Sequence, residues 1–128
     1  MRVLLDTHVL LWLLYKPERL SAVARNTLED PGNELLFSAA SVWEIAIKAQ
    51  LRRADFNADP AEVAADASEY GVHELPVRSS VAAAVTTLPM HHRDPFDRLL
   101  IAQAIAEPAR LLTADAHLIP YSELVTLV

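Results

Sequence analysis

The segment "RVLLDTHVLLWLLY", residues 2–15, contains the pattern that predicts the fold class. Residues 2–5 form a short apolar run, which indicates a strand buried on both faces. Asp6 follows at once, and residues 7–15 are apolar nearly all round over a length that fits a helix. A buried strand that leads directly into a helix is the repeating unit of α/β proteins. This segment therefore predicts the first such unit.

The rest of the chain repeats this alternation. Helices are predicted at residues 21–29, 41–51, 59–70, 79–88 and 95–107, and strands at residues 34–38, 109–115 and, at a sheet edge, 123–128. Residues 72–77 fit either a short strand or a loop. Because the strand segments are continuously apolar, they predict a mostly parallel sheet covered by helices on both faces. The length, without linker or repeat, predicts a single domain over residues 1–128.

The composition excludes several classes of protein. Glycine occurs only twice, which rules out the glycine-rich loops that hold nucleotide phosphates. Cysteine is absent, which rules out disulfides, thiolate zinc sites and cysteine nucleophiles. The formal net charge of −6 argues against a protein that grips DNA tightly through a basic surface.

The apolar N-terminal segment is not read as an export signal. Asp6 and His8 interrupt it, and no small-residue cleavage site follows. No stretch has the roughly 20 apolar residues that a membrane helix needs. We therefore expect a cytoplasmic protein without a membrane partner.

Five carboxylates stand where predicted strands end or predicted helices begin: Asp6, Glu44, Asp94, Asp97 and Asp115. Each has a structural explanation when taken alone. Asp6 and Asp94 fit helix N-caps, Asp97 favours the helix dipole, and Asp115 fits a turn cap. Glu44 stands three residues after Ser41, in the spacing of a capping box, and four residues before Lys48, in the spacing of a helical ion pair.

Their positions together indicate chemistry. In a parallel sheet, the carboxyl ends of the strands and the amino ends of the following helices share one edge, where ligands bind. Two like charges about 4 Å apart repel by about 4 kcal/mol at an effective dielectric constant of 20. Cations held between the carboxylates would offset this cost, and all-oxygen ligands suit Mg²⁺ or Mn²⁺. Such ions support phosphodiester hydrolysis, because they activate water and neutralise the leaving oxygen.

Basic side chains near the acids are weaker signals. Arg93 and Arg98 flank the acidic pair of residues 94 and 97 and could bind a substrate phosphate, or they could be solvated charges at a helix start. The histidines expected at the same edge, His8, His91, His92 and His117, lack the spacing of a zinc site. We expect them to be solvated or to form hydrogen bonds rather than to take part in catalysis.

Four stretches together resemble the PIN domain family, and specifically the VapC-type toxin ribonucleases of bacterial toxin–antitoxin pairs. They are "VLLDTHVLLW" (3–12), "SAASVWEIAIK" (38–48), "HRDPFDRLLIAQA" (92–104) and "LLTAD" (111–115). The resemblance spans nearly the whole chain in the order that the family has. It implies a three-layer α/β/α fold, a Mg²⁺- or Mn²⁺-dependent endoribonuclease, an RNA substrate, a homodimer and a small antitoxin that occludes the site.

The resemblance also assigns roles to residues. It implies that Asp6, Glu44, Asp97 and Asp115 are catalytic, and that Asp6, Asp97, Asp115 and Asp94 bind the metal. The choice between Asp94 and Asp97 stays open, with Asp97 favoured because it stands next to the "LLIA" of the motif. Thr7 and Thr113 lie beside the acids and are expected to hydrogen-bond them.

Two alternatives remain at the level of sequence. One is a PIN-like binding module without turnover, against which the complete set of acids argues. The other is a phosphotransfer domain that forms an aspartyl-phosphate on Asp6. Haloacid dehalogenase-like enzymes have a second aspartate two residues on, where this chain has His8. The receiver pattern needs an aspartate after a middle strand, and "LLFSAAS" (35–41) has none.

Overall fold

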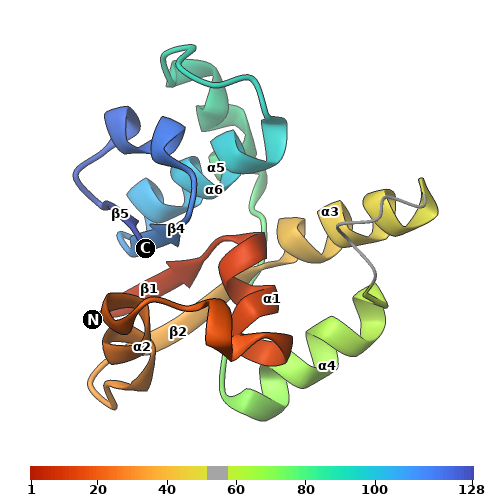
Figure 1. The fold of residues 1–128 in the computed structure, drawn as a ribbon. Helices are drawn as coiled ribbons and strands as arrows, with labels where there is room; N and C mark the ends of the chain where they lie inside the picture. The colour runs from red at the N-terminus through yellow and green to blue at the C-terminus, as the bar shows by residue number, and fades with distance from the viewer. Residues whose placement is uncertain (52–57) are drawn as a thin grey trace.

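A computed structural model describes residues 1–51 and 58–128 and contains a five-stranded, all-parallel sheet (Figure 1). The strands lie in the order β3-β2-β1-β4-β5. Their bounds are β1 Arg2–Leu5, β2 Glu34–Ser38, β3 His73–Leu75, β4 Arg110–Thr113 and β5 Val125–Leu127. The predicted α/β class is confirmed, and the ambiguous segment at residues 72–77 contains a strand.

Helices cover both faces of this sheet. The α-helices are α1 Thr7–Tyr15, α2 Ala22–Glu29, α3 Ala39–Gln50, α4 Pro60–Tyr70, α5 Ser79–Ala84 and α6 Pro95–Ala106. The chain also contains three 3₁₀-helices, η1 Pro17–Arg19, η2 Val85–Thr87 and η3 Ala116–Tyr121. The sequence predicts neither η1 nor η3, whereas η2 lies within the helix predicted at residues 79–88. Figure 1 shows α1, α2 and α4 on one side of the sheet and α5 and α6 on the other. No helix in the described ranges is long and apolar enough to cross a bilayer.

Alternate residues of the central strands enter two separate cores, which explains why the strand sequences are continuously apolar. Val3 and Leu5 of β1 pack with α1, α2 and α4 in one core. Leu4, between them, packs with α6 and η3 in the other. Successive side chains of a strand point to opposite faces, so a strand covered on both sides needs apolar residues at every position.

Helix α3 begins earlier than the sequence pattern indicates. The Ser41–Glu44 capping box is wrong, because the helix starts at Ala39 and its N-cap is Ser38, the last residue of β2. The Ser38 hydroxyl accepts a hydrogen bond from the Ala40 N–H at 3.0 Å. Because Glu44 does not cap the helix, its carboxylate is able to contact Thr7 of α1.

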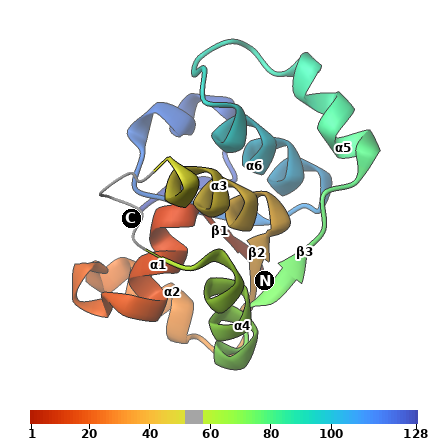
Figure 2. The same cartoon turned by 90° about the vertical axis from the view of Figure 1, so that its right-hand side faces the viewer.

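The sheet topology places the predicted acids at one edge. The strand order turns back at β1, so the chain leaves β1 and β4, which are neighbours, toward opposite faces. Such a switch point opens a crevice outside the carboxyl ends of the strands. Asp6 directly follows β1, and Asp115 lies two residues after β4. Figure 2 shows α3 between α4 and α6 on this side of the molecule.

The two-core packing predicts a large difference between two isoleucines of α6. Ile101 is fully buried, whereas Ile105 is 45% exposed. We expect Ile101→Ala to lower the free energy of unfolding by about 2–5 kcal/mol, because it leaves a cavity in the core. Ile105→Ala should change it by less than about 1 kcal/mol. Urea unfolding of both variants measures the difference, and equal losses would contradict the packing of α6.

Candidate functional site

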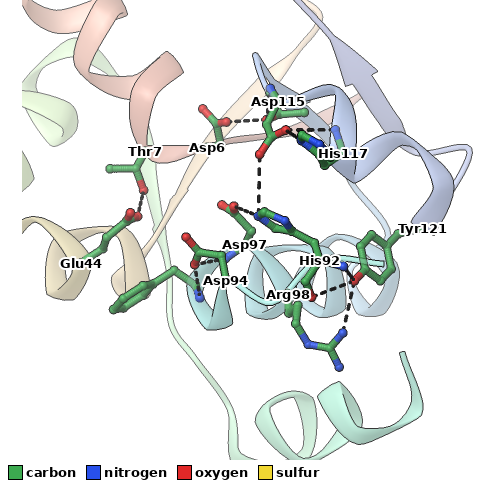
Figure 3. Close-up of polar contacts among 12 residues, drawn as sticks. Asp6, Thr7, Glu44, His92, Asp94, Asp97, Arg98, Asp115, His117 and Tyr121 are labelled. Atoms are coloured by element: carbon green, nitrogen blue, oxygen red, sulfur yellow. Dashed lines mark hydrogen bonds and ion pairs between the residues drawn. The ribbon is translucent and has the colours of Figure 1, made fainter. Parts of the chain in front are cut away.

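A cavity of about 480 Å³ lies at the carboxyl edge of the sheet. All five predicted carboxylates line it: Asp6, Glu44, Asp94, Asp97 and Asp115. Asp6 and Asp115 follow β1 and β4, Asp94 and Asp97 stand at the start of α6, and Glu44 lies in the second turn of α3. Figure 3 shows how closely these side chains lie. The structure therefore brings together residues that are up to 109 positions apart in the chain (115 − 6).

Asp6 is fixed between β1 and β4. Its Oδ1 accepts a hydrogen bond from the Val9 N–H at 2.8 Å, which caps α1. Its Oδ2 accepts a hydrogen bond from the Thr113 hydroxyl at 2.6 Å. Burial raises the pKa of Asp6, and the hydrogen bonds from Thr113 and Val9 offset part of this rise. The expected contact of Thr113 with an acid is thus present.

Glu44 is held on both of its oxygens. The Thr7 hydroxyl donates to Oε1 at 2.6 Å and lies 3.0 Å from the Ser41 hydroxyl. The Lys48 ammonium donates to Oε2 at 2.7 Å, so the predicted ion pair across one helical turn is present. These contacts fix the carboxylate of Glu44 at the wall of the cavity.

Asp94 and Asp97 play different parts at the start of α6. Asp94 is the N-cap, and its Oδ1 accepts hydrogen bonds from the N–H groups of Phe96 at 2.8 Å and Asp97 at 3.3 Å. Burial and then the charge of Asp94 raise the pKa of Asp97 to about 7, although a hydrogen bond with His92 lowers it. The charges of Asp6 and Glu44 also raise the pKa of Asp97.

Asp115 behaves in the opposite way. Burial raises its pKa, but hydrogen bonds from the backbone and ring of His117, together with the charges of His117 and His92, outweigh it. The pKa of Asp115 is therefore held below its usual range. The His117 ring nitrogen Nδ1 lies 2.8 Å from Asp115 Oδ1. One end of the cavity thus carries a carboxylate that stays ionised.

His92 joins the two halves of the site and was not predicted to do so. Its Nε2 lies 3.0 Å from Asp97 Oδ2 and 3.7 Å from Asp115 Oδ2. Its ring stacks on that of His117 at a centroid distance of 5.8 Å. His92 lies in the loop before α6, where no spacing rule identifies a ligand. Only the fold places it between the two carboxylates.

Arg98 does not line the acidic cavity. Its side chain points away from the acids (Figure 3) and is buried, with 7% exposure. Its guanidinium donates to the carbonyl oxygens of Pro89 at 2.9 Å and Val85 at 3.1 Å, and to the Tyr121 hydroxyl at 3.2 Å. Arg98 therefore anchors the segment that leads to His92, whereas Arg93 is exposed on that segment.

The side chains of the cavity fit a divalent cation. Ligand atoms of His92, Asp94 and Asp97 lie within 4.8 Å of one another, and Asp6 and Asp115 line the same cavity. This donor set is mostly carboxylate oxygen with one imidazole, which suits Mg²⁺ or Mn²⁺ better than softer metals. A cation at this point would favour the ionised form of Asp97, whose pKa the other acids raise.

Comparison with known proteins identifies relatives over nearly the whole chain. The sequence model of the PIN domain family matches residues 3–123. Ribonuclease VapC22 of Mycobacterium tuberculosis is 36% identical over 117 residues, which cover 91% of this chain and 88% of that protein.

Solved structures share the fold at low sequence identity. VapBC2 from Rickettsia felis, bound to a DNA fragment from its promoter, matches with a TM-score of 0.70 and 15% identity, over 100% of this chain and 98% of that chain. A toxin–antitoxin complex from Klebsiella pneumoniae matches with a TM-score of 0.62 and 16% identity, over 97% and 95%.

The raised pKa of Asp97 predicts opposite effects of Asp97→Asn without and with metal. In the unfolded chain an aspartate has a pKa of about 3.9. The folded value of about 7 means that ionised Asp97 destabilises the metal-free fold increasingly as the pH rises through this window. In EDTA the variant should therefore melt above wild type, by more at pH 8 than at pH 5. Excess Mn²⁺ should raise the melting temperature of wild type by several degrees, but not that of the variant. Thermal unfolding measures both effects.

Glu69→Gln, at an exposed position on α4, is the matched control for the loss of one negative charge. It should retain the full response to Mn²⁺. An equal Mn²⁺ response in wild type and Asp97→Asn would remove Asp97 from the metal site.

Proposed function

The chain belongs to the PIN domain family, and on this basis we propose that it is a metal-dependent endoribonuclease that acts as the toxin of a toxin–antitoxin pair. One observation carries the proposal. Five carboxylates from four elements line one cavity, in a chain that is 36% identical to a ribonuclease. The reaction is the hydrolysis of an RNA phosphodiester bond.

We propose Mg²⁺ or Mn²⁺ as the metal, held by Asp6 and Asp97 with contributions from Asp94 and Asp115. The bound ion would activate water and stabilise the charge that develops on the phosphate and the leaving oxygen. Glu44 is the further acid proposed to act in catalysis. Both candidate residues at the start of α6 keep a role, since Asp94 lines the cavity and also caps the helix that carries Asp97.

Hydrogen bonds within the chain fix the positions of the acidic side chains. Thr113 and the Val9 N–H orient Asp6, so that its carboxylate faces the cavity in one position. The backbone hydrogen bonds of Asp94 fix the first turn of α6, and with it the direction of Asp97. His92 spans Asp97 and Asp115 and fixes the distance between these two carboxylates. Rigid placement of this kind lowers the cost of ordering the substrate.

The partners are proposed from the same relationship. The Klebsiella pneumoniae structure is a toxin–antitoxin complex, and this supports a small antitoxin protein as the partner of the present chain. We further propose that the chain forms a homodimer and acts in the cytoplasm, where RNA is its substrate.

Ribonuclease activity is tested with purified chain and bulk transfer RNA in Mg²⁺. We expect cleavage that EDTA abolishes and that Asp97→Asn lowers by more than about 100-fold, because this variant loses a ligand rather than one of its supporting groups. Gel electrophoresis of end-labelled RNA measures the cleavage. Glu69→Gln should cleave as wild type does.

Two results would contradict the ribonuclease. Cleavage that survives both EDTA and Asp97→Asn comes from another nuclease. Failure of the folded wild type to cleave any RNA in Mg²⁺ or Mn²⁺ favours the alternative, a PIN-like binding module without turnover.

The toxin proposal makes a separate prediction in growing cells. Induced expression of the chain should stop bacterial growth, whereas Asp97→Asn at the same protein level should not. If a short reading frame lies next to the gene and encodes the antitoxin, its co-expression should restore growth. Growth that continues in spite of active, expressed wild type would separate the nuclease from a toxin role.

A further inference from the structure

We propose that Lys48 binds a phosphate of the RNA at the acidic cavity and that Glu44 positions its ammonium group for this contact. The inference rests on the proposed ribonuclease function and adds to it the residue that attracts the substrate. Sequence reasoning had considered Arg93 and Arg98 for that part. The structure uses Arg98 elsewhere and leaves Lys48 in the cavity.

The need for such a residue follows from charge. The chain has a net charge of −6, and five carboxylates line the cavity. A divalent cation offsets two of these charges, so an approaching phosphodiester still meets a negative site. Electrostatic attraction supplies much of the affinity for a nucleic-acid backbone. A lysine or arginine side chain inside the cavity would supply this attraction where cleavage takes place.

Lys48 is that side chain. Among the described residues that line the cavity, it is the one lysine or arginine. His8 and His92 also line it, and the ring of His92 already contacts Asp97 and Asp115. Lysine is a common phosphate ligand because its ammonium is a compact positive charge. Its four-carbon side chain reaches the cavity from α3.

The surrounding contacts fix the direction of this charge. Thr7, itself buried, donates to Glu44 Oε1, while Glu44 Oε2 accepts from Lys48. The carboxyl end of the pair is the more buried one, with side-chain exposures of 6% for Glu44 and 21% for Lys48. The buried carboxylate of Glu44 thus holds the ammonium of Lys48 at the wall of the cavity that both residues line.

Stability by itself is a poor explanation for this arrangement. An ion pair across one turn of a helix adds little to stability. Burying a carboxylate is costly, and a well-packed apolar pair would avoid this cost. A lysine tethered at the wall of an acidic cavity is explained if an anion enters that cavity during the reaction.

The chain offers a matched test because it has only two lysines, Lys16 and Lys48. Lys16 is exposed just after the carboxyl end of α1 and does not line the cavity. Lys48→Gln and Lys16→Gln remove the same charge, and glutamine at position 48 can still donate a hydrogen bond to Glu44. The measurement is kcat/KM for transfer RNA in Mg²⁺ over a series of KCl concentrations.

We expect Lys48→Gln to lower kcat/KM at low salt by about 10-fold or more, chiefly through KM. It should also make the plot of log kcat/KM against log salt shallower by about 0.7, the value for one phosphate contact on a single strand. Lys16→Gln should match wild type, and Lys48→Arg, which keeps the charge, should restore the salt dependence. A merely structural role would not change this slope.

The remaining outcomes separate this inference from the proposed function. If wild type cleaves RNA and Lys48→Gln keeps its rate and slope, the lysine contact is refuted and the ribonuclease stands. If Lys48→Gln loses the Mn²⁺ shift in melting temperature, the lysine supports the metal site instead, and the inference is also refuted. If wild type does not cleave RNA at all, both proposals fall.

Discussion

Repulsion among carboxylates at the carboxyl edge of the sheet is the constraint around which the site is built. Asp6 and Asp115 follow neighbouring parallel strands, and the first turn of α6 brings Asp94 and Asp97 against them. Asp97 shows the result, because burial and the surrounding charges raise its pKa to about 7. A fold that holds these groups together gives up stability for a place where a cation can bind.

The side chains around the acids limit this repulsion in different ways. Thr113 and the Val9 N–H donate hydrogen bonds to Asp6, and Thr7 and Lys48 donate hydrogen bonds to Glu44. The described residues contain no buried side-chain nitrogen or oxygen without a hydrogen-bond partner. Each carboxylate can therefore stay in place before any metal arrives, which is the condition for a site that needs little rearrangement to act.

Much of the support comes from residues that never face the cavity. Arg98 donates to backbone carbonyls of the segment before α6, and the Tyr121 hydroxyl accepts from the His92 N–H at 2.7 Å. Together they hold the loop that carries His92 toward Asp97 and Asp115. An arginine next to an acidic motif suggests a phosphate ligand, yet the donors of its guanidinium bind backbone carbonyl groups of the segment before α6 instead.

The sequence by itself determined the alternation of strands and helices, the parallel sheet and the edge to which Asp6, Glu44, Asp97 and Asp115 belong. These follow from local rules, because apolar runs, caps and chain order act within a few residues. Only the tertiary structure decided where α3 starts and that His92 contacts both Asp97 and Asp115. It also decided that Lys48 lines the cavity and that Arg98 binds backbone carbonyl groups instead. Each depends on a partner that lies far away in the chain or on another element, and no spacing rule reports which side chain will meet which once the layers have packed.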